Sequence, residues 1–466
     1  MQVYATHKDA HQLMLDAAMC LSKVSGNGIR MDVPYMKHAQ RKIAKQINRE
    51  VAEFEKLDSV KLWKKKYGVE YNHSSNEQLA DILFNELGYD SKKKTKSGAD
   101  AVDVNVLEEL LEETDDPMLK GLMHIRKLQK ASGTYIDGLL RETTDGYLHP
   151  SFPLCFARSY RSASRDPNFQ NIPTRDKEIK EYIRTAFIPR DGRQILELDF
   201  KGIEVSTAYM YHLDPTMRAY LLDPTKDMHR DMAMQLYKLG PDEWNKPCRQ
   251  GAKNKFVFPE FYGSYWKNVG TDLWKYAALN KLRVGKDEKG PTIFEHLAQN
   301  GIPNLEAYLN HVKKIEEHFW GKRFPVYTQW KEDWIAEYQK CGYFDSYTGF
   351  RYTGIFKRNE IINYAIQGSA SHCLLWTMCQ LQRWLERKGM KSLIIGQIHD
   401  SMVIDVVPSE LDDLLTYVQI LVRRKLPMRF EWISIPLTIE AEIAPIDAPW
   451  LKKAEIDIKS YLPKDN

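Results

Sequence analysis

The strongest constraint on the fold is a pair of apolar runs, residues 393–398 and 402–407, separated by three polar residues. Both runs are rich in the β-branched residues Ile and Val, which is typical of buried strands. His399, Asp400 and Ser401 lie between them. This pattern predicts a β-hairpin with a polar tip at the edge of a sheet. We therefore expect the carboxylate of Asp400 to face whatever lies beside that edge.

A second carboxylate ends a strand far upstream. Residues 194–200 have the pattern of a strand that carries Asp199 near its end and precedes a helix-like segment. If Asp199 and Asp400 lie about 4 Å apart, their charges repel by about 4 kcal/mol at an effective dielectric constant of roughly 20. Divalent cations remove that repulsion, and paired metal ions are a recurrent device for phosphoryl transfer. The two aspartates are therefore the candidate catalytic and metal-binding residues.

Composition bounds the class of protein. At 466 residues and 43% hydrophobic, the chain can bury a large core and divide into roughly two to four structural units. Its 67 basic and 63 acidic residues nearly cancel, so nucleic-acid binding requires local clusters of charge. The cysteines form no CxxC pair, which indicates reduced thiols. The sequence shows no secretory signal and no apolar segment of membrane-spanning length, so we expect a cytoplasmic protein without membrane contact.

Hydrophobic spacing and capping residues organise the rest of the chain. They predict helices over 10–24, from Pro34 to about 57, and over 103–130, 358–388 and 409–426. A loop near residue 95 carries the basic side chains Lys92, Lys93 and Lys94. Charge alone fits two interpretations of this loop equally well: non-specific contact with nucleic-acid phosphates, or a solubilising surface loop.

Two further segments have the composition of binding surfaces. Residues 161–173 contain two prolines, which exclude a continuous helix, and many Arg, Asn and Gln side chains that suit an extended ligand. On a helix over 249–263, Arg249 and Lys253 share a face, as do Phe258 and Tyr262. Such a helix offers cations to a polyphosphate and flat rings to a base. An ordinary surface helix with core aromatics fits the same pattern, so the segment is informative only beside the two aspartates.

Taken together and in this order, these segments resemble DNA polymerase family A, the DNA polymerase I type that includes many bacteriophage replicases. The resemblance covers residues from about 10 to the end. Residues 199–204 resemble the first palm motif, 249–263 the fingers helix, and 399–401 the second palm motif. Residues 161–173 resemble the primer–template segment, 363–368 the helix at the minor groove, and 227–229 the motif with a triphosphate-contacting histidine.

The resemblance implies an α+β right-hand fold, in which a palm with an antiparallel sheet carries helical fingers and a helical thumb. Residues 1–34 would form a lead-in helix on the palm. The implied thumb covers 35–137, the palm 138–215 and 350–466, and the fingers 216–349. The implied activity is template-directed DNA synthesis with two Mg²⁺ ions, Mn²⁺ being the alternative. Primer–template DNA and deoxynucleoside triphosphates are the implied partners.

Residue roles follow from the same resemblance. The metal ions would be held by Asp199, Asp400 and the backbone carbonyl of Phe200. The implied nucleotide-binding residues are Arg249, Lys253, His229, Phe258, Tyr262 and Glu204, with Tyr262 beside Glu204. The implied primer–template residues are Arg161, Gln170, Asn171, Asn363, Gln367, His399 and Arg358, to which the lysines at 92–94 are added on their charge.

The sequence departs from the family pattern at several places, two of which bear directly on the proposed site. Ser401 stands where a third palm carboxylate is usual, which leaves Asp199 and Asp400 as the acidic ligands. The spacing from Lys253 to Phe258 is five residues instead of four, and one extra residue turns a helix by about 100°. We expect a π-bulge or kink near Asn254–Lys255 that absorbs it. Lys255 therefore remains an alternative to Lys253 as the phosphate ligand.

Only about 34 residues precede the implied thumb, fewer than the ~50 of a small domain. We therefore expect no intrinsic 3′–5′ exonuclease, and a separate exonuclease subunit or processivity factor is a candidate partner. Two rival hypotheses remain. A single-chain RNA polymerase shares the palm, but Glu204 beside Tyr262 favours deoxynucleotides. A catalytically inactive DNA-binding module is the other, against which the retained aspartates argue. If the chain comes from a phage, the host cytoplasm is its expected location.

Overall fold

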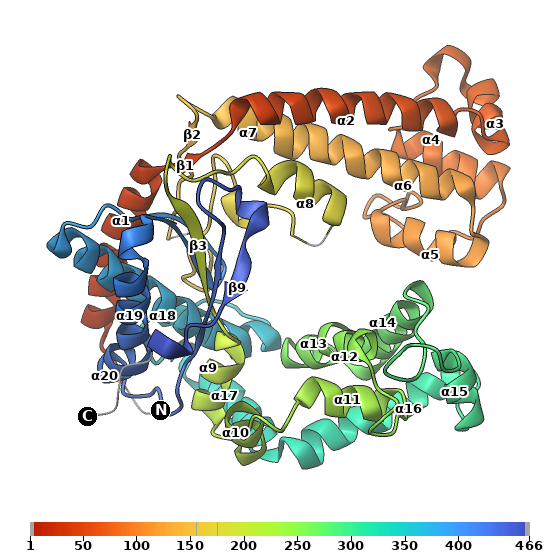
Figure 1. The fold of residues 1–466 in the computed structure, drawn as a ribbon. Coiled ribbons are helices and arrows are strands. Elements are labelled where there is room, and N and C mark those ends of the chain that lie inside the picture. Colours follow the sequence, from red (N-terminus) through yellow and green to blue (C-terminus); the bar gives the residue numbers. More distant parts are fainter. Residues whose placement is uncertain (1–3, 155, 175, 462–466) are drawn as a thin grey trace.

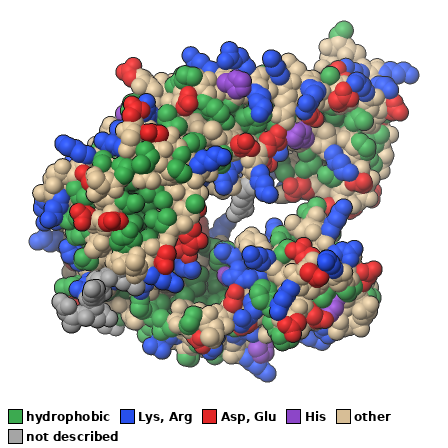
Figure 2. Space-filling model, in the orientation of Figure 1, with side chains coloured by type: hydrophobic (Ala, Val, Ile, Leu, Met, Phe, Trp, Pro, Cys, Tyr) green, Lys and Arg blue, Asp and Glu red, His purple; other side chains and the backbone are tan. Residues whose placement is uncertain are grey.

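The computed structural model describes residues 4–154, 156–174 and 176–461. In Figure 1 a central sheet carries two helical arms, which extend from it on the same side. The space-filling view in Figure 2, which includes the side chains, shows a deep hollow between the arms. We call this hollow the cleft.

A five-stranded antiparallel sheet lies at the closed end of the cleft. Its strands run in the order β6, β7, β3, β8 and β9. Their bounds are Leu393–Ile398 (β6), Ser401–Val406 (β7), Gln194–Phe200 (β3), Ile439–Ile443 (β8) and Ala454–Ile456 (β9). The hairpin predicted at 393–407 is β6–β7, and the predicted strand 194–200 is β3. Both predictions are confirmed.

The two faces of the sheet are buried against different elements. On β3 the side chains of Leu196, Leu198 and Phe200 join a large core with α1 (His7–Asn27), α9 (Ile203–His212) and α18 (Arg358–Lys388). Ile195 belongs to a second core on the opposite face. Since side chains alternate along a strand, Glu197 and Asp199 share the face of Ile195.

The upper arm in Figure 1 is built around two long helices, α2 (Val33–Phe54) and α6 (Pro117–Lys130). Asp32 caps α2 by accepting a hydrogen bond from the backbone N–H of Tyr35, and Pro34 lies in the first helical turn. The far end of this arm has a hydrophobic core of its own. It contains the shorter helices α3 (Asp58–Tyr67), α4 (Asn76–Asp81) and α5 (Val104–Thr114).

The predicted single helix over 103–130 is wrong. The structure has two helices, α5 and α6, with Asp115 between them in the left-handed region (φ 50°). Asp116 then caps α6, and Pro117 opens it. Proline cannot donate to the preceding turn, so the helix has to end before it. The predicted helix over 409–426 is present as one continuous helical segment, in which a π-helical turn over Leu421–Lys425 joins α19 (Leu411–Ile420) to α20 (Leu426–Arg429).

The lower arm is helical throughout. Its helices are α10 (Pro215–Leu222), α11 (Met228–Leu236), α12 (Lys246–Ala252), α13 (Phe258–Phe261), α14 (Trp266–Leu279), α15 (Ile293–Gln299), α16 (Leu305–His318) and α17 (Pro325–Cys341). An ion pair of 2.5 Å between Lys275 on α14 and Glu109 on α5 joins the ends of the two arms.

Smaller elements complete the fold. They are α7 (Gly138–Glu142), α8 (Lys177–Arg184), the pair β1 (Ile29–Arg30) and β2 (Tyr147–Leu148), and the pair β4 (Tyr343–Asp345) and β5 (Arg351–Thr353). The five described cysteines are free thiols, and Cys155 lies outside the described residues. Among the described residues, none of the helices combines the length and apolar character needed to cross a membrane.

Candidate active site

The sheet brings the two predicted aspartates together. β3 and β7 are antiparallel neighbours with Asp199 opposite Ser401, the residue after Asp400. The backbone N–H of Phe200 donates to the carbonyl of Asp400 at 3.1 Å. The end of β3 is therefore bonded directly to the hairpin turn, so both carboxylates lie at one edge of the sheet although two hundred residues separate them in sequence.

The electrostatics of these two acids are unfavourable. The pKa of Asp199 is raised to about 7, first by burial within the cleft and then by the charges of Asp400, Glu197 and Glu440. Solvent still reaches Asp199, so the shift comes from partial shielding by the cleft walls and from this accumulation of negative charge. The pKa of Asp400 is also raised, mainly by burial, with Arg161 and His399 acting in the opposite direction.

Two acids nearby form ion pairs, whereas Asp199 and Asp400 form none with the described residues. Glu197 pairs with Lys453 at 2.5 Å, and Glu440 pairs with Lys201 at 2.6 Å. Over the described part of the chain, neither Asp199 nor Asp400 has a hydrogen-bonded or ion-paired side-chain partner. This arrangement fits an external cation.

The donor set is small and made of oxygen. In the described residues, no group of three or more His, Cys, Asp or Glu side chains could hold a metal ion. Ser401 does not replace the missing acid, because its buried hydroxyl donates to the carbonyl of Ile398 at 2.9 Å. Two carboxylates remain, with the Phe200 carbonyl as the predicted third oxygen ligand. Hard oxygen ligands of this kind suit Mg²⁺, which keeps several waters of its own.

A pocket of about 350 Å³ adjoins Asp400. Glu204, in the first turn of α9, lines this pocket, and its carboxylate accepts a hydrogen bond from the Tyr262 hydroxyl and pairs with Arg161. Arg161 also donates from Nε to the carbonyl of Gln367 at 3.3 Å. The lining includes the predicted residues Phe258, Asn363, Gln367 and His399. The structure thus gathers predicted nucleotide and primer–template residues around one space.

The lower arm adds a group of cations and rings beside this pocket. The His229 ring meets the Phe258 ring edge-on with centroids 5.7 Å apart, and Lys253 Nζ lies 5.3 Å from the Phe258 centroid. Arg249 Nε donates to Asp227 at 2.6 Å. The pKa of His229 is lowered to about 4, first by burial and then by Arg249 and Lys253. His229 is therefore a neutral imidazole at pH 7 next to two cations.

The extra residue in this helix is absorbed as expected. A π-helical turn over Lys253–Val257 separates α12 from α13. It is one of several, the others spanning Ile82–Glu86, Ala131–Asp137, Phe319–Arg323 and Leu421–Lys425. With the wider turn in place, Lys253 lies with His229 and Phe258. Lys255 has no hydrogen-bonded or ion-paired partner within the described ranges.

Other predicted primer–template residues lie elsewhere or have protein partners. Gln170 is bonded internally to Gln397 at 2.7 Å, Asn171 is exposed, and Arg358 pairs with Glu332. At the far end of the upper arm, the three lysines all form ion pairs: Lys92 with Glu113 (2.9 Å), Lys93 with Asp103 (2.9 Å) and Lys94 with Asp100 (2.6 Å). Their charges are therefore partly neutralised.

Sequence reasoning missed Gln397 and Ser162, which lie buried beneath the turn of Asp400 and bond to each other at 2.6 Å. One signal was available: Gln397 is a polar residue inside an apolar strand, and a buried amide requires partners. The identity of those partners, more than two hundred residues away, has no local signature.

An antiparallel sheet with paired acids at its edge, set between two helical arms, defines a right-hand polymerase fold. The comparisons with known proteins agree. The model of "DNA polymerase family A" matches residues 35–280 and 299–448, and the chain belongs to this family. The predicted α+β right-hand fold is likewise confirmed.

Individual relatives are distant and longer. This chain is 26% identical to DNA polymerase I of Chloroflexus aurantiacus over 95% of its own length and 43% of that protein. It is 26% identical to the thermostable DNA polymerase I of Thermus aquaticus, over 93% and 47% respectively. It therefore spans less than half of these curated relatives. The POL domain of Pol1 from M. smegmatis, solved with DNA primer-template and dNTP, superposes with a TM-score of 0.73 at 23% identity, covering 94% of this chain and 70% of that one.

Members of family A use divalent metal ions. The relatives named above are bacterial, so the bacteriophage origin stays a prediction.

Proposed function

We propose that this chain is a template-directed DNA polymerase that adds deoxynucleotides to the 3′-hydroxyl of a primer. One observation carries the proposal. Asp199 on β3 and Asp400 in the turn before β7 have no paired cation among the described residues, and the pocket lined by Asp400 is also lined by Phe258, whose ring contacts Lys253 and His229. Acids on one side and cations on the other suit a metal-bound triphosphate.

Asp199, Asp400 and the Phe200 carbonyl would hold two Mg²⁺ ions, or Mn²⁺ as the alternative. When bound, such ions supply Lewis acidity that activates the primer hydroxyl and neutralises charge on the departing pyrophosphate. The task of the protein is to fix the two carboxylates, and the bond between Phe200 and Asp400 does this by tying the strand to the turn. Catalysis of this kind depends on positioning and electrostatics rather than on a covalent intermediate.

The lower arm would bind the triphosphate. Lys253 contributes a point charge, and Arg249 keeps free N–H donors beyond the one that it gives to Asp227. His229, held neutral by burial, can donate one hydrogen bond to a phosphate oxygen without adding charge. Phe258 offers a ring beside them for the base or sugar.

Glu204 would select the sugar. Its carboxylate is fixed from two sides by Tyr262 and Arg161 and lies in the pocket next to Asp400. A group fixed in this way cannot move aside for a ribose 2′-hydroxyl, which favours a DNA polymerase over a single-chain RNA polymerase. Under this proposal Glu204→Ala incorporates ribonucleotides more readily. Unchanged discrimination against ribonucleotides would overturn the assignment of Glu204 as the residue that selects the sugar.

Primer–template DNA would occupy the cleft, with Arg161, Gln367 and His399 at the minor groove of the primer end and Asn363, Asn171, Gln170 and Arg358 along the template. The minor groove presents nearly the same acceptors for every base pair, so these contacts tolerate any sequence. In this proposal the upper arm is the thumb (35–137), the lower arm the fingers (216–349), and residues 138–215 and 350–466 the palm. We place the activity in the cytoplasm and keep a separate exonuclease subunit or processivity factor as candidate partners.

The direct test is primer extension by the purified chain with deoxynucleotides, in the presence of Mg²⁺ and of EDTA. We expect extension that depends on the template and requires the metal ion. DNA binding without extension in either buffer would instead support an inactive DNA-binding module.

A further inference from the structure

The turn that carries Asp400 accepts a hydrogen bond from the buried side-chain amide of Gln397. Gln397 lies on β6 and is 1% exposed. Its side-chain nitrogen donates to the backbone carbonyl of His399 at 2.6 Å. Its side-chain oxygen accepts hydrogen bonds from the Ser162 hydroxyl at 2.6 Å and from the Gln170 amide at 2.7 Å.

The chemistry of the partners fixes the orientation of this amide. The carbonyl of His399 can only accept a hydrogen bond, so it needs the NH₂ group of Gln397. Ser162 and Gln170 both donate to the other end, where only an oxygen can accept from both. Flipping the Gln397 amide would place its oxygen against the His399 carbonyl, whereas Ser162 and Gln170 can each either donate or accept; the His399 carbonyl therefore fixes the orientation of Gln397.

His399 needs such a restraint. It is a non-glycine residue in the left-handed region (φ 49°), which side chains adopt reluctantly, and it directly precedes Asp400. The turn is also bonded through Phe200 to the Asp400 carbonyl and through the Ser401 hydroxyl to the Ile398 carbonyl. Among these restraints, the bond from Gln397 is made to the strained residue itself.

Ser162 links this restraint to the pocket. It follows Arg161, whose guanidinium pairs with Glu204 and donates to the Gln367 carbonyl. Two consecutive residues therefore bond through their side chains to the two parts of the site: Arg161 to Glu204, and Ser162 to the Gln397 amide.

We propose that Gln397 is a positioning residue that fixes the His399 peptide and thereby the Asp400 carboxylate, and that Ser162 orients Gln397 for this task. The inference rests on the proposed function, which it deepens by naming residues that set the geometry of the acid pair without touching a substrate. Small errors in such geometry are costly, since a displacement of about 1 Å can lower a rate by about a hundredfold.

The chain provides a matched control. Ser164 is a buried serine in the same segment, 6% exposed against 8% for Ser162. Its hydroxyl bonds to the Pro167 carbonyl and to the Phe169 N–H, not to Gln397. Ser162→Ala and Ser164→Ala therefore remove comparable buried hydroxyls, but only the Ser162 hydroxyl bonds directly to the Gln397 amide.

The experiment compares Gln397→Met, Ser162→Ala and Ser164→Ala in the full chain. Mn²⁺ affinity is measured by electron paramagnetic resonance on the protein without DNA, alongside the thermal unfolding midpoint. Primer extension then gives kcat and the nucleotide KM. We expect Gln397→Met to lower kcat by about ten- to a hundredfold with little change in KM and to weaken Mn²⁺ binding several-fold. Ser162→Ala should lower both by about threefold, and Ser164→Ala should leave both within about twofold despite a similar fall in unfolding midpoint.

Equal Mn²⁺ affinity and kcat in Ser162→Ala and Ser164→Ala would overturn the proposal and leave the amide a purely structural group. If Gln397→Met fails to fold, the serine pair decides the question alone. If the unmodified chain extends no primer, the proposed function fails, whereas the Mn²⁺ titrations still test whether Gln397 and Ser162 set the acid pair.

Discussion

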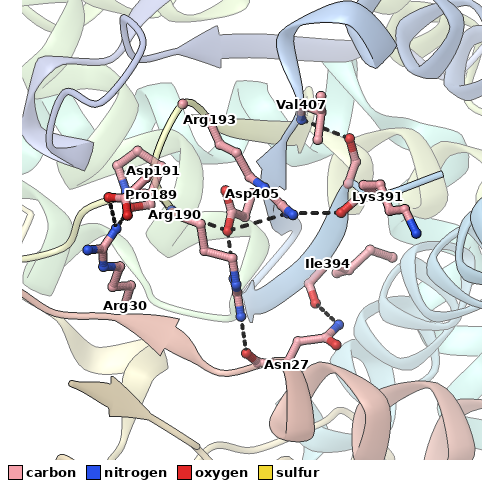
Figure 3. Close-up of polar contacts among 12 residues, drawn as sticks. Asn27, Arg30, Pro189, Arg190, Asp191, Arg193, Lys391, Ile394, Asp405 and Val407 are labelled. Atoms are coloured by element: carbon pink, nitrogen blue, oxygen red, sulfur yellow. Dashed lines mark hydrogen bonds and ion pairs between the residues drawn. The ribbon is translucent and has the colours of Figure 1, made fainter. Parts of the chain in front are cut away.

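Acidic side chains lie at both ends of the β3–β7 strand pair, and within the described residues they are paired with cations at only one of these ends. At the end away from the cleft, Asp405 of β7 lies opposite Ile195 and is 1% exposed. Arg190 pairs with its carboxylate at 2.6 Å, and Arg193 approaches to 3.9 Å. Figure 3 shows both arginines converging on Asp405, with Arg190 also reaching the carbonyl of Asn27. At the cleft end, four residues along β3 and in the turn before β7, Asp199 and Asp400 have no such partner among the described residues.

The contrast separates structural acids from candidate functional ones. A buried carboxylate is costly unless it is paired, and the Asp405 end satisfies that rule with side chains from the same chain. At the cleft end, solvent reaches both Asp199 and Asp400, and their mutual repulsion is not offset by a paired cation in the described residues, although Arg161 lies close enough to lower the pKa of Asp400 in part. The fold could supply arginines there, as it does at Asp405. Their absence leaves room for cations that arrive from outside the chain.

The most direct test of this contrast is to neutralise one acid at each end of the β3–β7 strand pair. Asp400→Asn removes a proposed metal ligand and should lower kcat for primer extension by about 10³-fold. It also relieves repulsion with Asp199, so we expect its unfolding free energy to stay equal or to rise. The measurements are single-turnover extension and urea unfolding without metal. Loss of folding stability with retained extension would contradict the assignment.

Asp405→Asn should have the opposite effects, a lower unfolding free energy and a nearly unchanged rate of primer extension. It leaves the partly buried Arg190 and Arg193 beside a neutral group, and breaking an ion pair whose acid is fully buried costs about 3 kcal/mol of unfolding free energy. The turn at Asp400 is unchanged, so the rate per folded molecule should remain within about twofold. Urea unfolding and active-site titration measure the two quantities. Lys453→Met, which unpairs Glu197 on the same face of the sheet, is a control for pairing nearer to the cleft.

The same distinction applies to the cations of the lower arm. Lys253 contacts a ring and has no acidic partner in the described structure, so its charge is available to a triphosphate. Lys253→Ala should raise the nucleotide KM by about tenfold, the value of one charge-assisted hydrogen bond. Lys255→Ala, two residues away, is the matched control and should change KM by less than about twofold. A larger loss for Lys255 would show that the π-helical turn presents the other lysine.

A pH titration tests the uncompensated pair without mutation. The pKa of Asp199 is about 7 in the folded protein, above the ordinary value of 3.8. Between these values the folded state binds more protons than the unfolded one, so stability without metal should fall as pH rises from about 4 to 7 and level off above 7. Because Asp199 is solvent-accessible, we expect only about 1 kcal/mol. Asp199→Asn should abolish this slope. Saturating Mg²⁺ should reverse it, because the metal binds the ionised form.

The sequence alone located the elements of this site but not the contacts between them. The hairpin, β3 and the long helix α18 (Arg358–Lys388) follow from local hydrophobic periodicity, and the π-helical turn follows from one residue too many. The break between α5 and α6 had a local signal in Asp116 and Pro117 that the hydrophobic pattern overrode. The bonds of Gln397 to Ser162 and of Arg190 to Asp405 join residues over two hundred positions apart, so only the folded sheet brings them together.

The smallest expected effect concerns the lysines at the far end of the upper arm. As at the Asp405 end of the strand pair, a cation that is already paired with an acidic side chain adds little to the affinity for a further anion. Lys92, Lys93 and Lys94 each pair with an acidic side chain of the same arm. Free lysines on phosphates would each add about 0.9 to the slope of log affinity against log salt, so losing all three would lower it by about 2.7. We expect the triple alanine variant to lower the slope by less than about 1, measured by DNA-binding titrations between low and physiological salt. A fall of the slope by about 2.7 would show that DNA phosphates replace Glu113, Asp103 and Asp100 as the partners of the three lysines when the duplex binds.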